Sequence, residues 1–244
     1  MIQVDFTTCG VSLEVEADSQ DFGQTVLDRF CGRPATFVET MTTTAKLPVA
    51  IMGGVATIDH QGLRGEIDLR RGRIRTPPSM LVADALVRAA VAWRLAERGG
   101  LLLHASAFRH GAGAVVAFGK SGVGKTTTAR ELGAALSDEF VVLRQGDSGW
   151  IAEGTPWWHG SGESAPLLRL LWLVRGESPS LRPAVPGELL RALVAQAGRF
   201  FPEADFQARL FALCADLARC GATRIAAAEG RVVPAVRDAL AVPP

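Results

Sequence analysis

The feature that most constrains this chain is a glycine-rich octapeptide, Gly119-Lys120-Ser121-Gly122-Val123-Gly124-Lys125-Thr126. It fits the pattern GxxxxGK[ST] at every fixed position, with the apolar segment AVVAF before it and the segment KTTTARELGAAL after it. Glycines let the backbone curl so that its N–H groups converge on phosphate oxygens. The sequence therefore predicts a strand, a phosphate-binding loop and a helix in series, which is an α/β nucleotide-binding arrangement.

The polar residues of this loop each have a predicted role in holding ATP. Lys125 would place its ammonium on the β- and γ-phosphates, and the hydroxyl of Thr126 would lie on Mg²⁺. Thr127 follows in the first turn of the helix, whose positive N-terminal end points at the same anion. Lys120 occupies a variable position and is expected to be solvated; the alternative is a charge near the γ-phosphate. We therefore predict ATP and Mg²⁺ as cofactors.

An acidic pair, Asp138 and Glu139, follows unusually soon after the loop. The helix between loop and acids is expected over residues 125–136, about three turns or roughly 15 Å, after which the chain must return beside the loop. One carboxylate, for which we select Asp138, could hold Mg²⁺, and the other could accept a proton from an incoming hydroxyl. The residues do not divide these two roles, and the alternative is a solvated turn at the end of the helix.

Composition limits the partners of the chain. Its formal net charge is only +1, so no global field attracts nucleic acid or an anionic membrane. No apolar run approaches the roughly 20 residues that span a bilayer, and the N-terminus lacks the pattern of a signal peptide. We therefore expect a cytoplasmic protein that binds neither nucleic acid nor membrane.

The periodicity predicts two domains. Residues 1–78 suit a small α+β domain: period-two segments such as VSLEVEA predict strands, and FGQTVLDRF predicts one short helix. Residues 79–244 suit the nucleotide-binding domain, which opens with an amphipathic helix over 79–98 capped by a serine. Strands are then expected at LLLHASAF, AVVAF, EFVVLR, WIAEG, LLRLLWLV and TRIAAAE, and helices at about 186–199, 204–219 and 234–241.

The series LLLHASAF…GKSGVGKTT…LSDEFVVL…GTPWW resembles the HPr kinase/phosphorylase family, and more closely its short bacterial HPr-kinase-like relatives, over about residues 80 to 240. The resemblance implies the P-loop domain that this family shares with phosphoenolpyruvate carboxykinases, here behind a smaller β-rich N-terminal domain. It also implies an ATP-dependent kinase of the Ser/Thr type, with metal-binding and general-base roles at the pair Asp138 and Glu139, not divided between the two. His104 matches the family's histidine on the strand before the loop, where it could orient or tune a carboxylate; the alternative is a structural core histidine.

The chain departs from HPr kinases after the catalytic core. The region APLLRLLWLVRGESPSLRPAVPGE lacks the glycine-rich segment with which those enzymes bind their protein substrate, which argues against HPr itself as the acceptor. Some relatives phosphorylate a peptide hydroxyl beside peptide-modifying enzymes, so a peptide or small protein from a peptide-maturation gene cluster is expected. The family also implies a homo-oligomer. The alternative function is a catalytically weak ATP-binding module that captures or releases a partner.

Other nucleotide-dependent classes are excluded by composition. The chain contains no Asn, so it has neither the Asn-Lys-x-Asp motif of GTPases nor the catalytic-loop Asn of eukaryotic protein kinases. Phosphoenolpyruvate carboxykinases are about twice this length and remain only fold relatives.

Three further features have a structural and a functional interpretation. The segment Thr155–His159 contains Trp157 and Trp158, which could stack an adenine, line a substrate groove or simply cover the core. Arginines at 64, 70, 71, 73 and 75 form either a solvated strand face or a docking site for an acidic partner. Arg169 and Arg175 flank an apolar strand, and one of them could reach the transferring phosphate.

Overall fold

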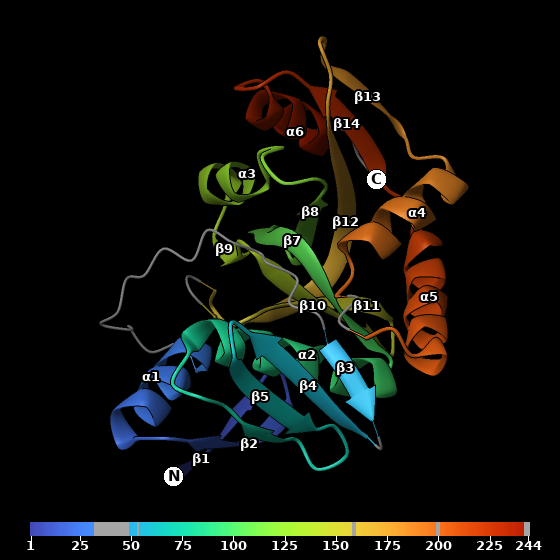
Figure 1. The fold of residues 1–244 in the computed structure, drawn as a ribbon. Coiled ribbons are helices and arrows are strands. Elements are labelled where there is room, and N and C mark those ends of the chain that lie inside the picture. The colour runs from blue at the N-terminus through green and yellow to red at the C-terminus, as the bar shows by residue number, and fades with distance from the viewer. Residues whose placement is uncertain (32–48, 53, 158–159, 199–200, 242–244) are drawn as a thin grey trace.

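The computed structural model describes the elements within residues 1–31, 49–52, 54–157, 160–198 and 201–241. The chain is a mixed α/β protein with two sheets (Figure 1). Among these residues, no helix has the length and apolar character needed to cross a membrane.

The N-terminal part forms a six-stranded sheet with one helix. Along the sheet the strands are β1 (Ile2–Thr8), β2 (Val11–Ala17), β6 (Arg73–Arg75), β5 (Leu63–Asp68), β4 (Val55–His60) and β3 (Val49–Met52), and α1 (Gln20–Phe30) follows β2 in the chain. Only the β2–β6 pair is parallel among these strands. The predicted alternation in VSLEVEA is confirmed, because every second residue of β2 is buried.

Helix α2 (Met80–Glu97) lies between the two sheets and begins, as predicted, at the Ser79 cap. It contacts β4 and β5 of the first sheet and β7 of the second. Its apolar residues are buried on several sides, so that the helix joins both sheets in one hydrophobic core. The predicted domain boundary at residue 78 stays a prediction.

The second sheet has eight strands. Its order is β11 (Gly149–Gly154), β10 (Phe140–Gly146), β7 (Gly100–His110), β8 (Gly113–Phe118), β12 (Ser164–Arg175), β14 (Thr223–Ala227) and β13 (Ser180–Pro183), with β9 (Ala135–Ser137) paired to β7. Strands β8, β12 and β14 run parallel to one another. Their carboxyl ends therefore meet at one edge, which is where open α/β sheets bind ligands.

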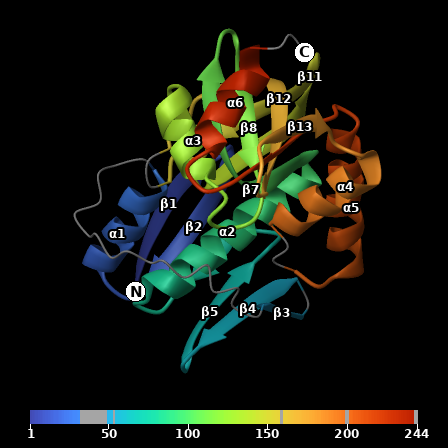
Figure 2. The same cartoon turned by 90° about the horizontal axis from the view of Figure 1, so that it is seen from above.

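Helices cover both faces of this sheet. Figures 1 and 2 show α3 (Lys125–Leu132) beside α6 (Val232–Ala241), and α4 (Pro186–Gln196) beside α5 (Ala204–Ala218). Val115 and Ala117 of β8 belong to the core under α3 and α6, whereas Val116 and Phe118 belong to the core with α2, α4 and α5. The continuous apolar run in β8 thus reflects burial on both faces.

The structure corrects the predicted helix over 125–136. Helix α3 ends at Leu132, and residues 135–137 form strand β9. A β-carbon at Gly133 would come within 2.6 Å of the Arg109 carbonyl, so the chain lies against β7 there and leaves the helix. The other boundaries shift less: α4 ends at Gln196, and α6 begins two residues early, at Val232. Strands β1, β9 and β13 were not predicted.

Candidate functional site

A cavity of about 750 Å³ lies at the carboxyl ends of β8, β12 and β14. Its walls bring together residues from separate parts of the sequence: Ser121–Thr127 after β8, Arg175 at the end of β12, Glu229 after β14, and the acids of the β9–β10 turn. All candidate residues of the site line it except Gly119 and Lys120. Gly119 begins the loop that forms one wall, and the Lys120 side chain is exposed, as predicted.

The loop of residues 119–126, hereafter the glycine loop, depends on backbone conformations that favour glycine. Gly119, Gly122 and Gly124 have φ values of 151°, 73° and 95°. A β-carbon at Gly119 would lie 2.2 Å from the carbonyl oxygen of Leu173 on β12. The glycine loop is therefore held directly against the neighbouring parallel strand, and α3 opens from it at Gly124.

Lys125 is the most buried charged residue of the glycine loop, with 6% of its surface exposed. Its ammonium donates to the carbonyl oxygens of Gly119 at 3.0 Å and Lys120 at 3.3 Å. Burial lowers the pKa of Lys125 from 10.5 to about 8. A cation that is desolvated and bonded only to loop carbonyls gains strongly from an anion in the cavity beside it.

The two acids reach this cavity because the chain returns along β7. After the two turns of α3, β9 pairs with β7, and the turn that follows is bonded to β7 as well. Ala105 N–H donates to the Glu139 carbonyl at 3.1 Å, and the Ser106 hydroxyl donates to the Asp138 carbonyl at 3.1 Å. The Thr126 hydroxyl donates to the same Asp138 carbonyl at 3.1 Å. The early position of the acids in the sequence is thus a consequence of a short helix and a direct return to β7.

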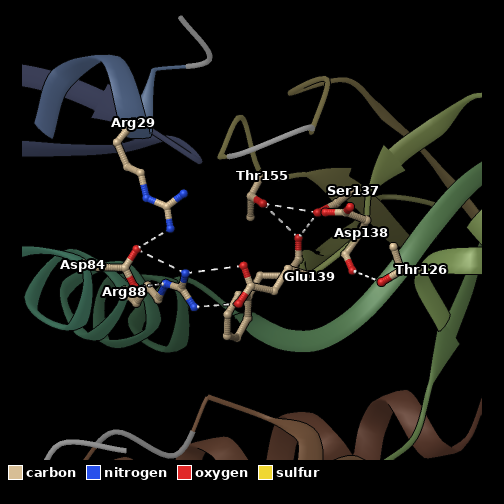
Figure 3. A network of polar contacts seen from close by, with 9 residues as sticks. Arg29, Asp84, Arg88, Thr126, Ser137, Asp138, Glu139 and Thr155 are labelled. Atoms are coloured by element: carbon tan, nitrogen blue, oxygen red, sulfur yellow. Dashed lines mark hydrogen bonds and ion pairs between the residues drawn. The ribbon is translucent and has the colours of Figure 1, made fainter. Parts of the chain in front are cut away.

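The carboxylates of the two acids have different partners, and Figure 3 draws that of Glu139. Asp138 accepts from Arg130 of α3 at 2.8 Å, and the Arg130 side chain is 58% exposed. Glu139 extends toward α2, where Arg88 donates to its two oxygens at 3.1 and 3.4 Å. The Arg88 side chain is only 10% exposed. Both acids line the cavity, but each carboxylate is paired with an arginine.

Neither Arg88 nor Arg130 was predicted. A signal was present for Arg88, because Asp84 and Arg88 form an i,i+4 charge pair within an otherwise apolar stretch of α2. The signal did not show that Arg88 reaches Glu139, which lines the cavity. That position depends on how α2 packs against β7, which no local pattern reveals.

The rings of His104 and Trp157 each lie close to that of Phe140. His104 is half-buried, lines the cavity, and has its ring centroid 5.6 Å from that of Phe140. Trp157 is buried against Phe30 and donates to the Thr8 hydroxyl at 2.7 Å. The core-covering interpretation is therefore confirmed for Trp157, which is no adenine platform. Trp158 and His159 lie outside the described residues.

Of the arginines that the sequence singled out, one lies at the cavity and the others described below lie elsewhere. Arg175 lines the cavity and donates to the Gly122 carbonyl at 3.3 Å, whereas Arg169 donates to the Ala239 carbonyl and lines a different cavity. In the N-terminal sheet, Arg73 and Arg75 pair with glutamates on β2 and β5. These two guanidinium groups thus belong to a charge ladder across the strands.

The residues of the cavity fit Mg²⁺ and a triphosphate. The described residues contain no cluster of three or more His, Cys, Asp or Glu that could hold a metal. Mg²⁺ bound with a nucleotide needs only one or two protein ligands, because phosphates and waters supply the rest. The Thr126 hydroxyl and the Asp138 carboxylate would be such a pair: the Thr126 hydroxyl donates to the main-chain carbonyl of Asp138, which keeps the two residues adjacent, and Lys125 with the glycine loop would face the phosphates.

The sequence matches no protein-family model, and no curated protein matches it.

Proposed function

We propose that the chain is an ATP-dependent, Mg²⁺-requiring kinase of the HPr-kinase-like type, which transfers the γ-phosphate to a Ser or Thr hydroxyl of a peptide or small protein. One observation supports this above the others: residues 121–126 of the glycine loop, with Lys125 and Thr126 among them, and both early acids line a single cavity. Phosphoryl transfer requires mainly positioning and charge neutralisation, which this set of groups would provide.

Each group has a role in that reaction. Lys125 and the N–H groups of the glycine loop would bind the β- and γ-phosphates, while Thr126 and Asp138 would hold Mg²⁺, which would neutralise phosphate charge when bound. The acceptor oxygen forms a bond to the γ-phosphorus as the bond from that phosphorus to the β–γ bridging oxygen breaks, and ADP leaves. The acceptor proton passes to a carboxylate, for which Glu139 is the candidate.

The kinase is tested by incubating the purified chain with labelled ATP, Mg²⁺ and peptides encoded next to its gene, alongside a Ser/Thr peptide library. We expect label on a peptide hydroxyl. Asp138→Asn and Glu139→Gln should leave ATP binding largely intact and abolish turnover in at least one case. Tight ATP binding without transfer to any peptide would count against a kinase.

One observation favours the alternative, an ATP-binding module that does not transfer phosphate. Both carboxylates are paired with arginines, and neither points freely into the cavity. In a binding module, the two acid substitutions would alter neither ATP affinity nor the capture of a partner. ATP affinity survives both substitutions under either function, so turnover separates the two: only a kinase transfers phosphate as the wild type and loses that transfer in a variant.

A further inference from the structure

A chain of four alternating charges connects helix α1 to the wall of the cavity (Figure 3). Arg29 of α1 donates to Asp84 of α2 at 2.7 Å, Asp84 pairs with Arg88 at 2.6 Å, and Arg88 binds Glu139. The side chains of Arg29, Asp84 and Arg88 are 10 to 14% exposed. Glu139 is the end of this chain that reaches the cavity.

Arg88 is fixed from several directions. Asp84 accepts from it on one side, and Glu139 accepts from both of its terminal nitrogens on another. The guanidinium also lies 4.7 Å from the centroid of the Phe140 ring and 6.0 Å from that of Trp157. A planar guanidinium held by two carboxylates and an aromatic face has few alternative positions. Glu139 is thus bound to a cation that cannot follow it into the cavity.

Asp138 presents the opposite case. The Asp138 side chain is only 12% exposed, but its partner Arg130 projects from α3 with 58% of its side chain in solvent, where water competes for the guanidinium and weakens the pair. Asp138 can therefore exchange Arg130 for a metal ion at small cost. Of two adjacent acids, one is held firmly and the other only loosely.

We propose that Arg88 is a positioning residue, which holds the Glu139 carboxylate at the cavity wall and neutralises its charge toward the phosphates of the nucleotide. The inference rests on the proposed function, because it takes the cavity to bind ATP. In this arrangement Glu139 is the acid whose carboxylate stays in place, and Asp138 is the acid that exchanges its arginine for the metal ion. Because Asp84 and Arg29 hold Arg88, the position of Glu139 also depends on the N-terminal part of the chain.

The test is a double-mutant cycle read by the affinity for a fluorescent ATP analogue, which needs no turnover. Arg88→Met leaves the Glu139 carboxylate without its cation, facing the phosphates, and should weaken binding about tenfold. In a Glu139→Gln background, the same change should alter affinity less than about twofold. Arg130→Met, which removes the exposed arginine beside Asp138, is the matched control and should also stay within about twofold.

Further outcomes distinguish this inference from the proposed function. If the wild type transfers phosphate, Arg88→Met and Glu139→Gln should lower kcat by similar factors, and the double variant by no more than either. If it binds ATP without transfer, the kinase is refuted while the affinity cycle still decides the role of Arg88. Equal weakening by Arg88→Met with and without Glu139→Gln would overturn the inference.

One further variant and one further readout cover failure of the first measurement. If Arg88→Met does not fold, Arg88→Lys keeps the charge without the two-pronged contact, and should retain ATP affinity while lowering kcat. If the wild type binds no nucleotide, the proposed function fails. The cycle is then read by the free energy of unfolding, where additive effects of Arg88→Lys and Glu139→Gln would refute the pairing itself.

Discussion

The buried ammonium of Lys125 predicts that ATP affinity falls steeply in mild alkali. The free protein holds this group at a pKa of about 8, lowered by burial. Phosphate oxygens in the cavity would stabilise the charged form and raise the pKa again, so binding above pH 8 takes up a proton. With a bound pKa near or above its ordinary 10.5, the dissociation constant should rise less than twofold from pH 7 to 8 and about tenfold by pH 9.

The assay is titration calorimetry with ATP and Mg²⁺ at constant ionic strength from pH 7 to 9.5. Repeating it in buffers of different ionisation enthalpy should show close to one proton taken up per site at pH 9. Lys125→Met should bind weakly and without this pH dependence, and Lys120→Met should keep the wild-type slope. A dissociation constant that stays level up to pH 9.5 would refute the argument, and so would an unchanged slope in Lys125→Met.

The lowered pKa of Lys125 also determines how the stability of the free protein depends on pH. The pKa of Lys125 is about 8 when folded and about 10.5 when unfolded, so between these values the unfolded chain binds more protons. The contribution of Lys125 to the free energy of unfolding should therefore rise with pH across that window. Chemical denaturation of wild type and Lys125→Met at pH 7 and 9 measures it, and the stability advantage of Lys125→Met should shrink at the higher pH.

Four substitutions test the backbone and the packing at separate positions of the fold. Gly119→Ala would bring a β-carbon within 2.2 Å of a β12 carbonyl, so we expect loss of ATP binding and a decrease of several kcal/mol in the free energy of unfolding, measured with denaturant. Its control Gly111→Ala, at a positive φ with open space, should lower the free energy of unfolding by only about 1 kcal/mol. Gly187→Ala, in α4 with nothing near its β-carbon, should instead stabilise by about 0.5–1 kcal/mol, and a lower melting temperature would contradict this. Trp157→Phe removes the donor to the buried Thr8 hydroxyl and should cost about 1–3 kcal/mol, seen as a shifted urea midpoint with an unchanged slope.

Regular elements with a strong period or a cap were predictable from the sequence. The alternation of β2, the Ser79 cap of α2 and the apolar run before the glycine loop each correspond to an observed element. Strand β9 was missed because it has only three residues and continues a helical pattern, and its conformation depends on pairing with β7. Strand β13 is equally short, and its Pro183 weakens the strand signal.

The candidate site likewise has a part that the sequence predicts and a part that only the packed structure shows. The glycine loop and the acid pair could be selected from spacing, since the chemistry of phosphate binding demands those residue types. Their meeting in one cavity depends on hydrogen bonds from the Ala105 N–H and the Ser106 hydroxyl of β7, which the sequence does not specify. The arginine partners of the acids come from α2 and α3, and only the packed structure identifies Arg88 as a neighbour of Glu139.

The position of α2 has a consequence for how the molecule comes apart. This helix has β-strands on two sides, and its residues Leu86, Val87 and Val91 have no exposed surface. A chain cut at residue 78 would keep α2 but lose the first sheet. The side of α2 that packs against that sheet would then expose a large apolar area to water. Heating should therefore melt both sheets in one calorimetric peak, and fragments lacking the first 78 residues should aggregate rather than persist as a smaller nucleotide binder.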